Sequence, residues 1–160
     1  MNAATRMFMV LSLATLFTLA AGIPLYAQND QAFITYRQKV MSSNGDNMAA
    51  IGEIMKSSLP MGKNIVTHAA NIEQTMLLAA SAFEKNISAG ATDSKPEIWA
   101  DWKKFVSLAE AAADKASTLS KVAMSGDMAA VGPAVKALGG ACGDCHKEFR
   151  KPKEESYKNK

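Results

Sequence analysis

The chain has 160 residues and a formal net charge of +3 at pH 7. A charge this small argues against a nucleic-acid-binding protein, because such proteins normally carry a strong basic field. Once a leader is removed, the remaining length suffices for one hydrophobic core but not for two.

The N-terminal segment has the pattern of a secretory signal peptide. Arg6 supplies a positive start, residues 7–21 form an apolar run, and Ala27 lies at a suitable cleavage point. A transmembrane anchor is the alternative, but the apolar run is shorter than the roughly 20 residues that span a bilayer. We therefore expect a signal peptide over residues 1–27, export to the periplasm, and a mature domain over residues 28–160 that has no membrane contact after cleavage.

The mature domain is predicted to be all-α. Its apolar residues recur at spacings of three and four, as on the buried face of a helix, whereas the alternation typical of strands is absent. This periodicity predicts four helices, over residues 30–56, 63–88, 95–125 and 127–151. Because the intervening loops are short, we expect an antiparallel four-helix bundle.

Two residues mark the expected starts of helices, and the composition of the last ten residues differs from that of the helical segments. Pro96 lies near the first position of the third helix, and Asp127 is a good N-cap for the fourth. Residues 151–160 are charged and lack an apolar stripe, so we expect this tail to be frayed.

The most specific motif of the chain is Cys142-Gly143-Asp144-Cys145-His146. Two cysteines separated by two residues, with histidine directly after the second, form the attachment signature of a c-type haem. Residues three apart share one face of a helix, so both thiols can form thioethers to the vinyl groups of one porphyrin. The imidazole of His146 can then bind the iron as an axial ligand.

The motif has three other interpretations. A zinc site usually takes four ligands, but the only other histidine, His68, is distant in sequence and there is no third cysteine. A thioredoxin-like redox pair requires a βαβ context that the pattern does not predict. A plain disulfide leaves His146 unexplained. Covalent haem c is therefore the preferred prediction, and a haem-free protein with thiol redox chemistry is an alternative.

The sequence around this motif resembles the class II c-type cytochromes, which comprise cytochrome c′ and its low-spin relatives of the cytochrome c-556 type. The resemblance rests on the position of the motif near the C-terminus and on three further segments, Tyr36-Arg37-Gln38, Lys95-Pro96-Glu97-Ile98-Trp99 and Ser125-Gly126-Asp127. It implies a four-helix bundle with covalent haem near one end, a monomeric or homodimeric state, and a role without enzymatic activity. Arg150 is similar to the family arginine near the proximal histidine.

The same resemblance makes the second axial position the decisive question. Cytochromes c′ cover the open side of a five-coordinate iron with an apolar residue, whereas the low-spin relatives place a methionine ligand there. In an antiparallel bundle the start of the first helix lies beside the end of the fourth, which favours Met41. At about 1.5 Å of rise per residue, Met48 lies roughly 10 Å and Met55 roughly 20 Å further along. The resemblance to the low-spin members also points to Met41.

Residues one turn from Met41 suit a haem site. Arg37, Met41 and Gly45 share a helix face, so Arg37 can pair with a haem propionate and Gly45 leaves room for the macrocycle. A solvated arginine and a local helix bend are the ordinary interpretations of these two residues.

Two functions follow for the haem protein. The first is a periplasmic electron carrier with His146 and Met41 as axial ligands, which docks briefly with redox partner proteins. The second is a five-coordinate cytochrome c′ that binds nitric oxide or carbon monoxide. Lys147, Lys151 and Lys153 form either a basic docking patch near the haem edge or a solvated helix end.

Overall fold

The computed structural model describes residues 25–159 of the chain. Most of the predicted signal peptide lies outside this range, and only residues 25–27 of it belong to a described helix. The cleavage site and the boundary of the mature domain therefore stay predictions. None of the described helices has both the length and the apolar character needed to cross a bilayer.

The fold is built from helices alone. In chain order they are α1 (Leu25–Lys56), α2 (Asn64–Leu77), α3 (Ala79–Phe83), α4 (Glu97–Ala100), α5 (Trp102–Ser125) and α6 (Met128–Phe149), followed by the short 3-10 helices η2 (Lys153–Glu155) and η3 (Tyr157–Asn159). Between residues 25 and 159 there is no strand, and the sole β-type pairing is an isolated bridge between Ser94 and Arg150. The predicted all-α class is confirmed.

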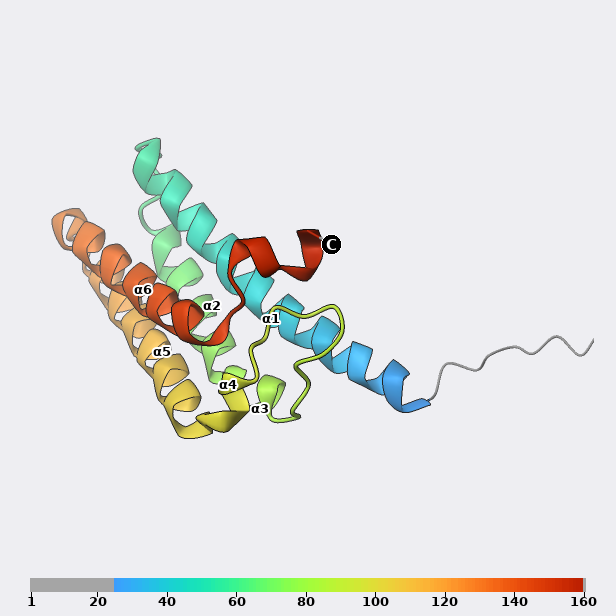
Figure 1. Ribbon diagram of the computed structural model, residues 1–160. Coiled ribbons are helices and arrows are strands. Elements are labelled where there is room, and N and C mark those ends of the chain that lie inside the picture. Colours follow the sequence, from blue (N-terminus) through green and yellow to red (C-terminus); the bar gives the residue numbers. More distant parts are fainter. Residues whose placement is uncertain (1–24, 160) are drawn as a thin grey trace, which may run out of the picture.

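Four long segments form an antiparallel bundle: α1, α2 continued by α3, α5, and α6 (Figure 1). Helix α2 packs against both α1 and α5, and α5 packs against α6. Within the described part of the chain, α1 and α6 hardly contact each other. The ring of helix packing is therefore open between the first and the last helix.

Two apolar clusters fill the bundle. The larger cluster joins isoleucine and leucine side chains to a row of small alanines, which let α2 and α5 approach closely; its fully buried members include Ile51, Ile65, Ile72, Ala112, Ala116, Leu119 and Leu138. The smaller cluster is mainly aromatic and contains Val40, Ala82, Phe83, Ile98, Phe105 and Phe149. Phe149 brings the end of α6 into this second cluster.

The helix boundaries differ from the prediction: α1 begins at Leu25 and not at residue 30, and a break at Leu78 separates α2 from α3. Two further differences bear on the site. The second helical segment ends at Phe83 and not at Ser88, although Ile87 continues the apolar spacing and is buried. The third segment is interrupted at Asp101 (φ −126°, ψ 59°), whose carboxylate accepts a hydrogen bond from the N–H of Lys104 at 3.3 Å. Asp101 therefore caps α5 and separates it from α4.

The start of α6 agrees with the sequence. The Asp127 carboxylate accepts hydrogen bonds from the N–H groups of Ala129 (3.1 Å) and Ala130 (3.2 Å). The N-cap predicted at Asp127 is confirmed, and it fixes where the motif-bearing helix begins.

The expectation of a frayed tail was wrong. After α6 the chain folds back, and the N–H of Lys151 donates to the carbonyl of Asp93 at 2.8 Å. The Asp93 carboxylate then accepts from the Ser156 hydroxyl and from the Tyr157 N–H, both at 3.0 Å. Apolar periodicity does not detect such a segment, because polar bonds to one distant aspartate hold it in place.

Candidate haem site

Helix α6 presents the motif at its C-terminal end. Cys142 and Cys145 are half-buried, and they pack against the larger and the smaller apolar cluster respectively. His146 follows at the surface of the helix. The helix ends three residues later because Phe149 turns into the core and Arg150 adopts an extended conformation (φ −110°, ψ 138°). The thiols and the imidazole are thus held by one rigid turn.

The protonation states of the motif argue against thiol redox chemistry and leave the histidine able to bind iron. Burial raises the pKa of the Cys142 thiol, and burial followed by the charge of Cys142 raises the pKa of Cys145 to about 11. Redox-active cysteine pairs instead lower a thiol pKa to form the reactive thiolate. The pKa of His146 is lowered, mainly because neighbouring atoms partly desolvate its imidazole and secondly because Arg150 is positively charged. The neutral imidazole is the form that binds iron.

The level of Met41 in the bundle follows from a contact at the opposite end. A Cβ added at Gly132 of α6 would lie 3.9 Å from the Cε of Met55 on α1. Met41 is fourteen residues before Met55, and His146 is fourteen residues after Gly132. Because the helices are antiparallel, both steps run in the same direction by about 21 Å at 1.5 Å per residue. Met41 and His146 therefore lie at about the same level.

Met41 also shares its surroundings with the cysteines. It is half-buried and packs against both apolar clusters, the larger one together with Cys142 and the smaller one together with Cys145. Met48, two turns further along α1, packs only against the larger cluster. The structure thus brings Met41 and the motif to the place where the two clusters meet.

A buried amide lies one turn from Met41. Asn44 is 7% exposed, and its Nδ2 donates to the Sδ of Met76 on α2 at 3.2 Å. Its Oδ1 is a buried polar side-chain atom without a hydrogen-bond partner in residues 25–159. Buried polar atoms normally have a hydrogen-bond partner. The Asn44 oxygen therefore fits a site that also holds a non-protein group. Sequence reasoning gave Asn44 no separate role, although its i+3 spacing from Met41 was a usable signal.

Arg37 has a structural role that its sequence did not reveal. The side chain is 2% exposed. Its Nε donates to the carbonyl of Ala82 and its Nη1 to that of Ile87, both at 2.9 Å, and its Nη2 donates to the carbonyl of Lys85. These bonds hold the chain after α3 in a non-helical course. The pairing of Arg37 with a haem propionate stays a prediction. It would have to use the guanidinium N–H groups that do not take part in these three hydrogen bonds.

Arg150 lies beside the motif on its C-terminal side. Its backbone N–H donates to the carbonyl of His146 at 3.0 Å, and its guanidinium forms an ion pair with Asp93 at 3.6 Å. Asp93 therefore contacts both Arg150 and the tail. Sequence reasoning missed Asp93, because nothing in the sequence indicates that the tail returns to it.

These features together fit a flat covalent prosthetic group between α1 and α6. Two thiols that can form thioethers to the porphyrin, together with a neutral imidazole and a methionine thioether that can bind the iron, are the groups that hold a c-type haem. A Cβ added at Gly45 of α1, or at Gly139 or Gly140 of α6, would meet no atom within 4 Å, and the same holds at Gly52 further along α1, so open space alone does not mark the site. By contrast, residues 25–159 contain no group of three His, Cys, Asp or Glu side chains able to hold a metal ion, so the zinc interpretation gains no support.

Comparison with known proteins agrees with this site. Residues 32–150 match the family model described as Cytochrome C′. The chain is 35% identical over 146 residues to cytochrome c′ of Rhodospirillum rubrum, covering 91% of this chain and 97% of that protein. It is 30% identical over 120 residues to cytochrome c-556 of Agrobacterium tumefaciens, covering 71% and 93%.

A solved structure shows the same fold. The nitric oxide complex of a mutant cytochrome c′ from Alcaligenes xylosoxidans superposes with a TM-score of 0.69 and 26% identity, covering 78% of this chain and 97% of that one. The relatives include both cytochromes c′ and cytochromes c-556, as the resemblance of the sequence implied. The chain therefore belongs to the cytochrome c′ family, the class II c-type cytochromes, which are helical-bundle electron carriers with covalently attached haem c.

Proposed function

We propose that this protein is a low-spin electron carrier of the periplasm. Cys142 and Cys145 carry the haem through thioethers, and His146 and Met41 are the two axial ligands of its iron. The observation that supports this ligand set best is the shared level of Met41 and His146, derived from the contact between α1 and α6 at the far end of the bundle. Met41 also borders both apolar clusters beside the cysteines.

The bound haem supplies a centre that gains and loses one electron. The polypeptide holds this centre and excludes water. The neutral imidazole of His146 offers a lone pair, and the uncharged thioether of Met41 raises the reduction potential. The aromatic cluster around Phe105 and Phe149 keeps the end of α6 fixed, so little of the protein has to move when the charge changes. No substrate binds and no bond is made or broken in this role.

Export is part of the proposal. Residues 1–27 have the charge and the apolar run of a signal peptide, and the motif requires haem attachment outside the cytoplasm. The mature domain of residues 28–160 would then meet its redox partners in the periplasm.

A five-coordinate, gas-binding protein is the second candidate. It is supported by relatives named cytochrome c′ at 35% identity and by a related structure that is a nitric oxide complex. In this alternative Met41 covers the open side of the iron without bonding to it, and nitric oxide or carbon monoxide binds there.

The absorption spectrum of the haem-loaded protein discriminates the two candidates. Under the first proposal the ferric protein is low-spin and shows the far-red sulfur-to-iron charge-transfer band. Met41→Ala should abolish this band and make the iron high-spin, whereas Met48→Ala, a matched change on the same helix, should keep it. A high-spin ferric spectrum before any substitution would contradict Met41 ligation and favour the gas-binding protein.

The attachment residues have their own test. Haem should remain on the polypeptide after denaturing electrophoresis, and the double variant Cys142→Ala/Cys145→Ala should lose it. A wild-type band without haem would contradict both haem proposals.

A further inference from the structure

The face of α6 that carries His146 opens into a strongly basic pocket. This pocket has a volume of about 730 Å³ and lies between the end of α6 and the folded-back segment 151–159. Six cationic side chains line it: Lys95, Lys147, Arg150, Lys151, Lys153 and Lys158. His146 lines it as well, and none of its lining residues is acidic. We call it the basic pocket.

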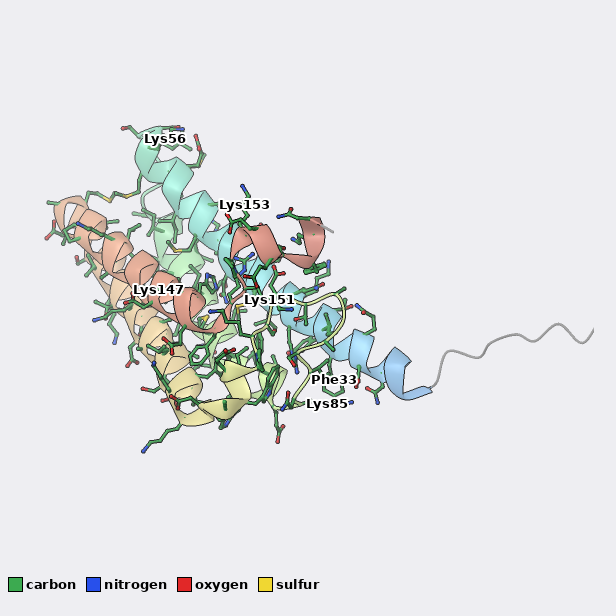
Figure 2. The ribbon with its side chains drawn as sticks, in the orientation of Figure 1. Phe33, Lys56, Lys85, Lys147, Lys151 and Lys153 are labelled. Carbon is green, nitrogen blue, oxygen red and sulfur yellow. The ribbon has the colours of Figure 1, made fainter. Side chains whose placement is uncertain are left out.

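The cations gather here because the tail is held back against the end of α6. Asp93 anchors the tail through Ser156 and Tyr157, and this anchor carries Lys153 and Lys158 to the pocket. On the opposite side, the Nζ of Lys95 donates to the carbonyls of Lys147 and Glu148, at 3.3 and 3.1 Å. Figure 2 shows Lys147 on α6 and Lys151 and Lys153 on the segment that follows it.

Nearby carboxylates leave most of this charge uncompensated. Asp93 is paired with Arg150. Glu148, which does not line the pocket, is paired with Lys104 at 2.8 Å and also interacts with the charges of Lys95 and Lys147. Glu154 and Glu155 belong to the tail but do not line the pocket. The whole chain has a net charge of only +3, so six cations around one pocket represent a concentrated field and not a uniformly basic surface.

We propose that the basic pocket is the docking surface for an acidic face of the redox partner protein. This inference rests on the proposed electron-carrier function. A carboxylate-bearing surface docked on the exposed lysines of the pocket would lie beside the turn of α6 that carries the haem. Charge complementarity of this kind speeds encounter and orients the partner more than it adds lasting affinity, as a carrier that must dock and leave requires.

A protein surface fits the pocket better than a tightly held small anion does. Lys147, Lys153 and Lys158 are exposed and make no side-chain hydrogen bond within the described chain, so each retains its mobility. Exposed ion pairs with such side chains are individually weak and are screened by salt. Several of them acting together give binding that is fast, reversible and sensitive to ionic strength.

The test uses the haem-loaded protein and fluorescein-labelled hexaglutamate, with binding followed by fluorescence anisotropy. Lys147→Gln/Lys153→Gln/Lys158→Gln removes three charges from the pocket. Lys56→Gln/Lys63→Gln/Lys121→Gln removes three exposed charges at the opposite end of the bundle, where α1 ends, α2 begins and α5 ends, and is the matched control. Figure 2 shows Lys56 at that distant end of α1.

The pocket variant should weaken hexaglutamate binding by about ten- to thirtyfold, since each exposed pair contributes about two- to threefold. The control variant should stay within about twofold of the wild type, and raising the salt concentration should abolish wild-type binding. Equal weakening in both variants, no weakening in the pocket variant, or no binding to the wild type would overturn the proposal. The last two results are also expected if the lysines serve only to neutralise haem propionates.

The same samples separate this inference from the proposed function. Their ferric spectra report the ligation of the iron, whereas the anisotropy reports the surface. A high-spin spectrum with selective loss of peptide binding would contradict Met41 ligation and support the docking surface. A low-spin spectrum without selective loss would contradict the docking surface alone.

Discussion

Asp93 and Ser156 lie 63 residues apart in the sequence and are joined by a hydrogen bond of 3.0 Å from the serine hydroxyl to the carboxylate. The second carboxylate oxygen accepts from the N–H of Tyr157 at the same distance. Ser156 is buried as a result, with 7% of its surface exposed. Through these two hydrogen bonds, Asp93 holds the charged tail in an ordered position beside His146.

Replacing the anchor should release the tail. In Asp93→Ala both bonds are lost, and hydrogen bonds to charged groups are worth about 1.5–3 kcal/mol. We therefore expect the segment after Arg150 to open at least about tenfold more often, and trypsin to cleave after Lys153 correspondingly faster, as read by mass spectrometry. Asp114→Ala, an exposed aspartate on α5, is the control. Equal cleavage of the two variants would show that Asp93 does not hold the tail.

Arg37 should contribute to stability independently of any contact with haem. Arg37→Met removes three hydrogen bonds, one to the carbonyl of Ala82 in α3 and two to carbonyls after it, and we expect the free energy of unfolding in denaturant to fall by about 3 kcal/mol. Lys39→Met, an exposed change on the same helix, should alter it by less than about 0.5 kcal/mol. If Arg37 served only as a propionate partner, its loss would change the reduction potential while the unfolding free energy stayed near that of the control.

Gly45 and Gly52 offer a matched pair on α1. Each is exposed, and an added Cβ would meet no atom of the described chain within 4 Å. Alanine at Gly52 should raise the unfolding free energy by about 0.5–1 kcal/mol through helix propensity. Alanine at Gly45, one turn from Met41, should instead disturb the ligation that Met41 provides and weaken the far-red sulfur-to-iron band. Identical behaviour of the two variants would argue that Gly45 has no role in accommodating the macrocycle.

Phe105 should be the most sensitive aromatic residue beside the motif. Its ring centroid lies 5.2 Å from that of Phe83 and 5.5 Å from those of Trp102 and Phe149. Phe105→Ala should cost about 3–5 kcal/mol of unfolding free energy. Phe105→Leu retains most of the apolar volume and should cost clearly less. Chemical denaturation of both variants measures the difference, and an equally small loss in both would contradict the importance of this cluster.

The sequence predicted what depends on local spacing. Periodicity located the four long helical segments, the N-cap at Asp127 followed from its side-chain chemistry, and the spacing of Cys142, Cys145 and His146 indicated haem before any fold was known. The family resemblance is confirmed over residues 32–150. Each of these signals is contained within a few neighbouring residues.

The features that sequence reasoning missed depend on contacts between distant segments. Ile87 continues a helical pattern, but Arg37 draws the carbonyls of Ala82, Lys85 and Ile87 toward itself and ends the helix at Phe83. The return of the tail depends on Asp93 in the same way. Neither contact produces a periodic pattern in the sequence. The end of α3 and the position of the tail beside the candidate site therefore follow only from the three-dimensional structure.

The weak contact between α1 and α6 has a consequence for the stability of the fold. Among the helices, α1 is held mainly by α2 and α3, so within residues 25–159 the polypeptide makes three extensive helix interfaces and only a few contacts at the fourth. A covalent haem between α1 and α6 would add contacts at this fourth interface. The haem would then contribute to the stability of the fold as well as to electron transfer, and α1 would depend on it most.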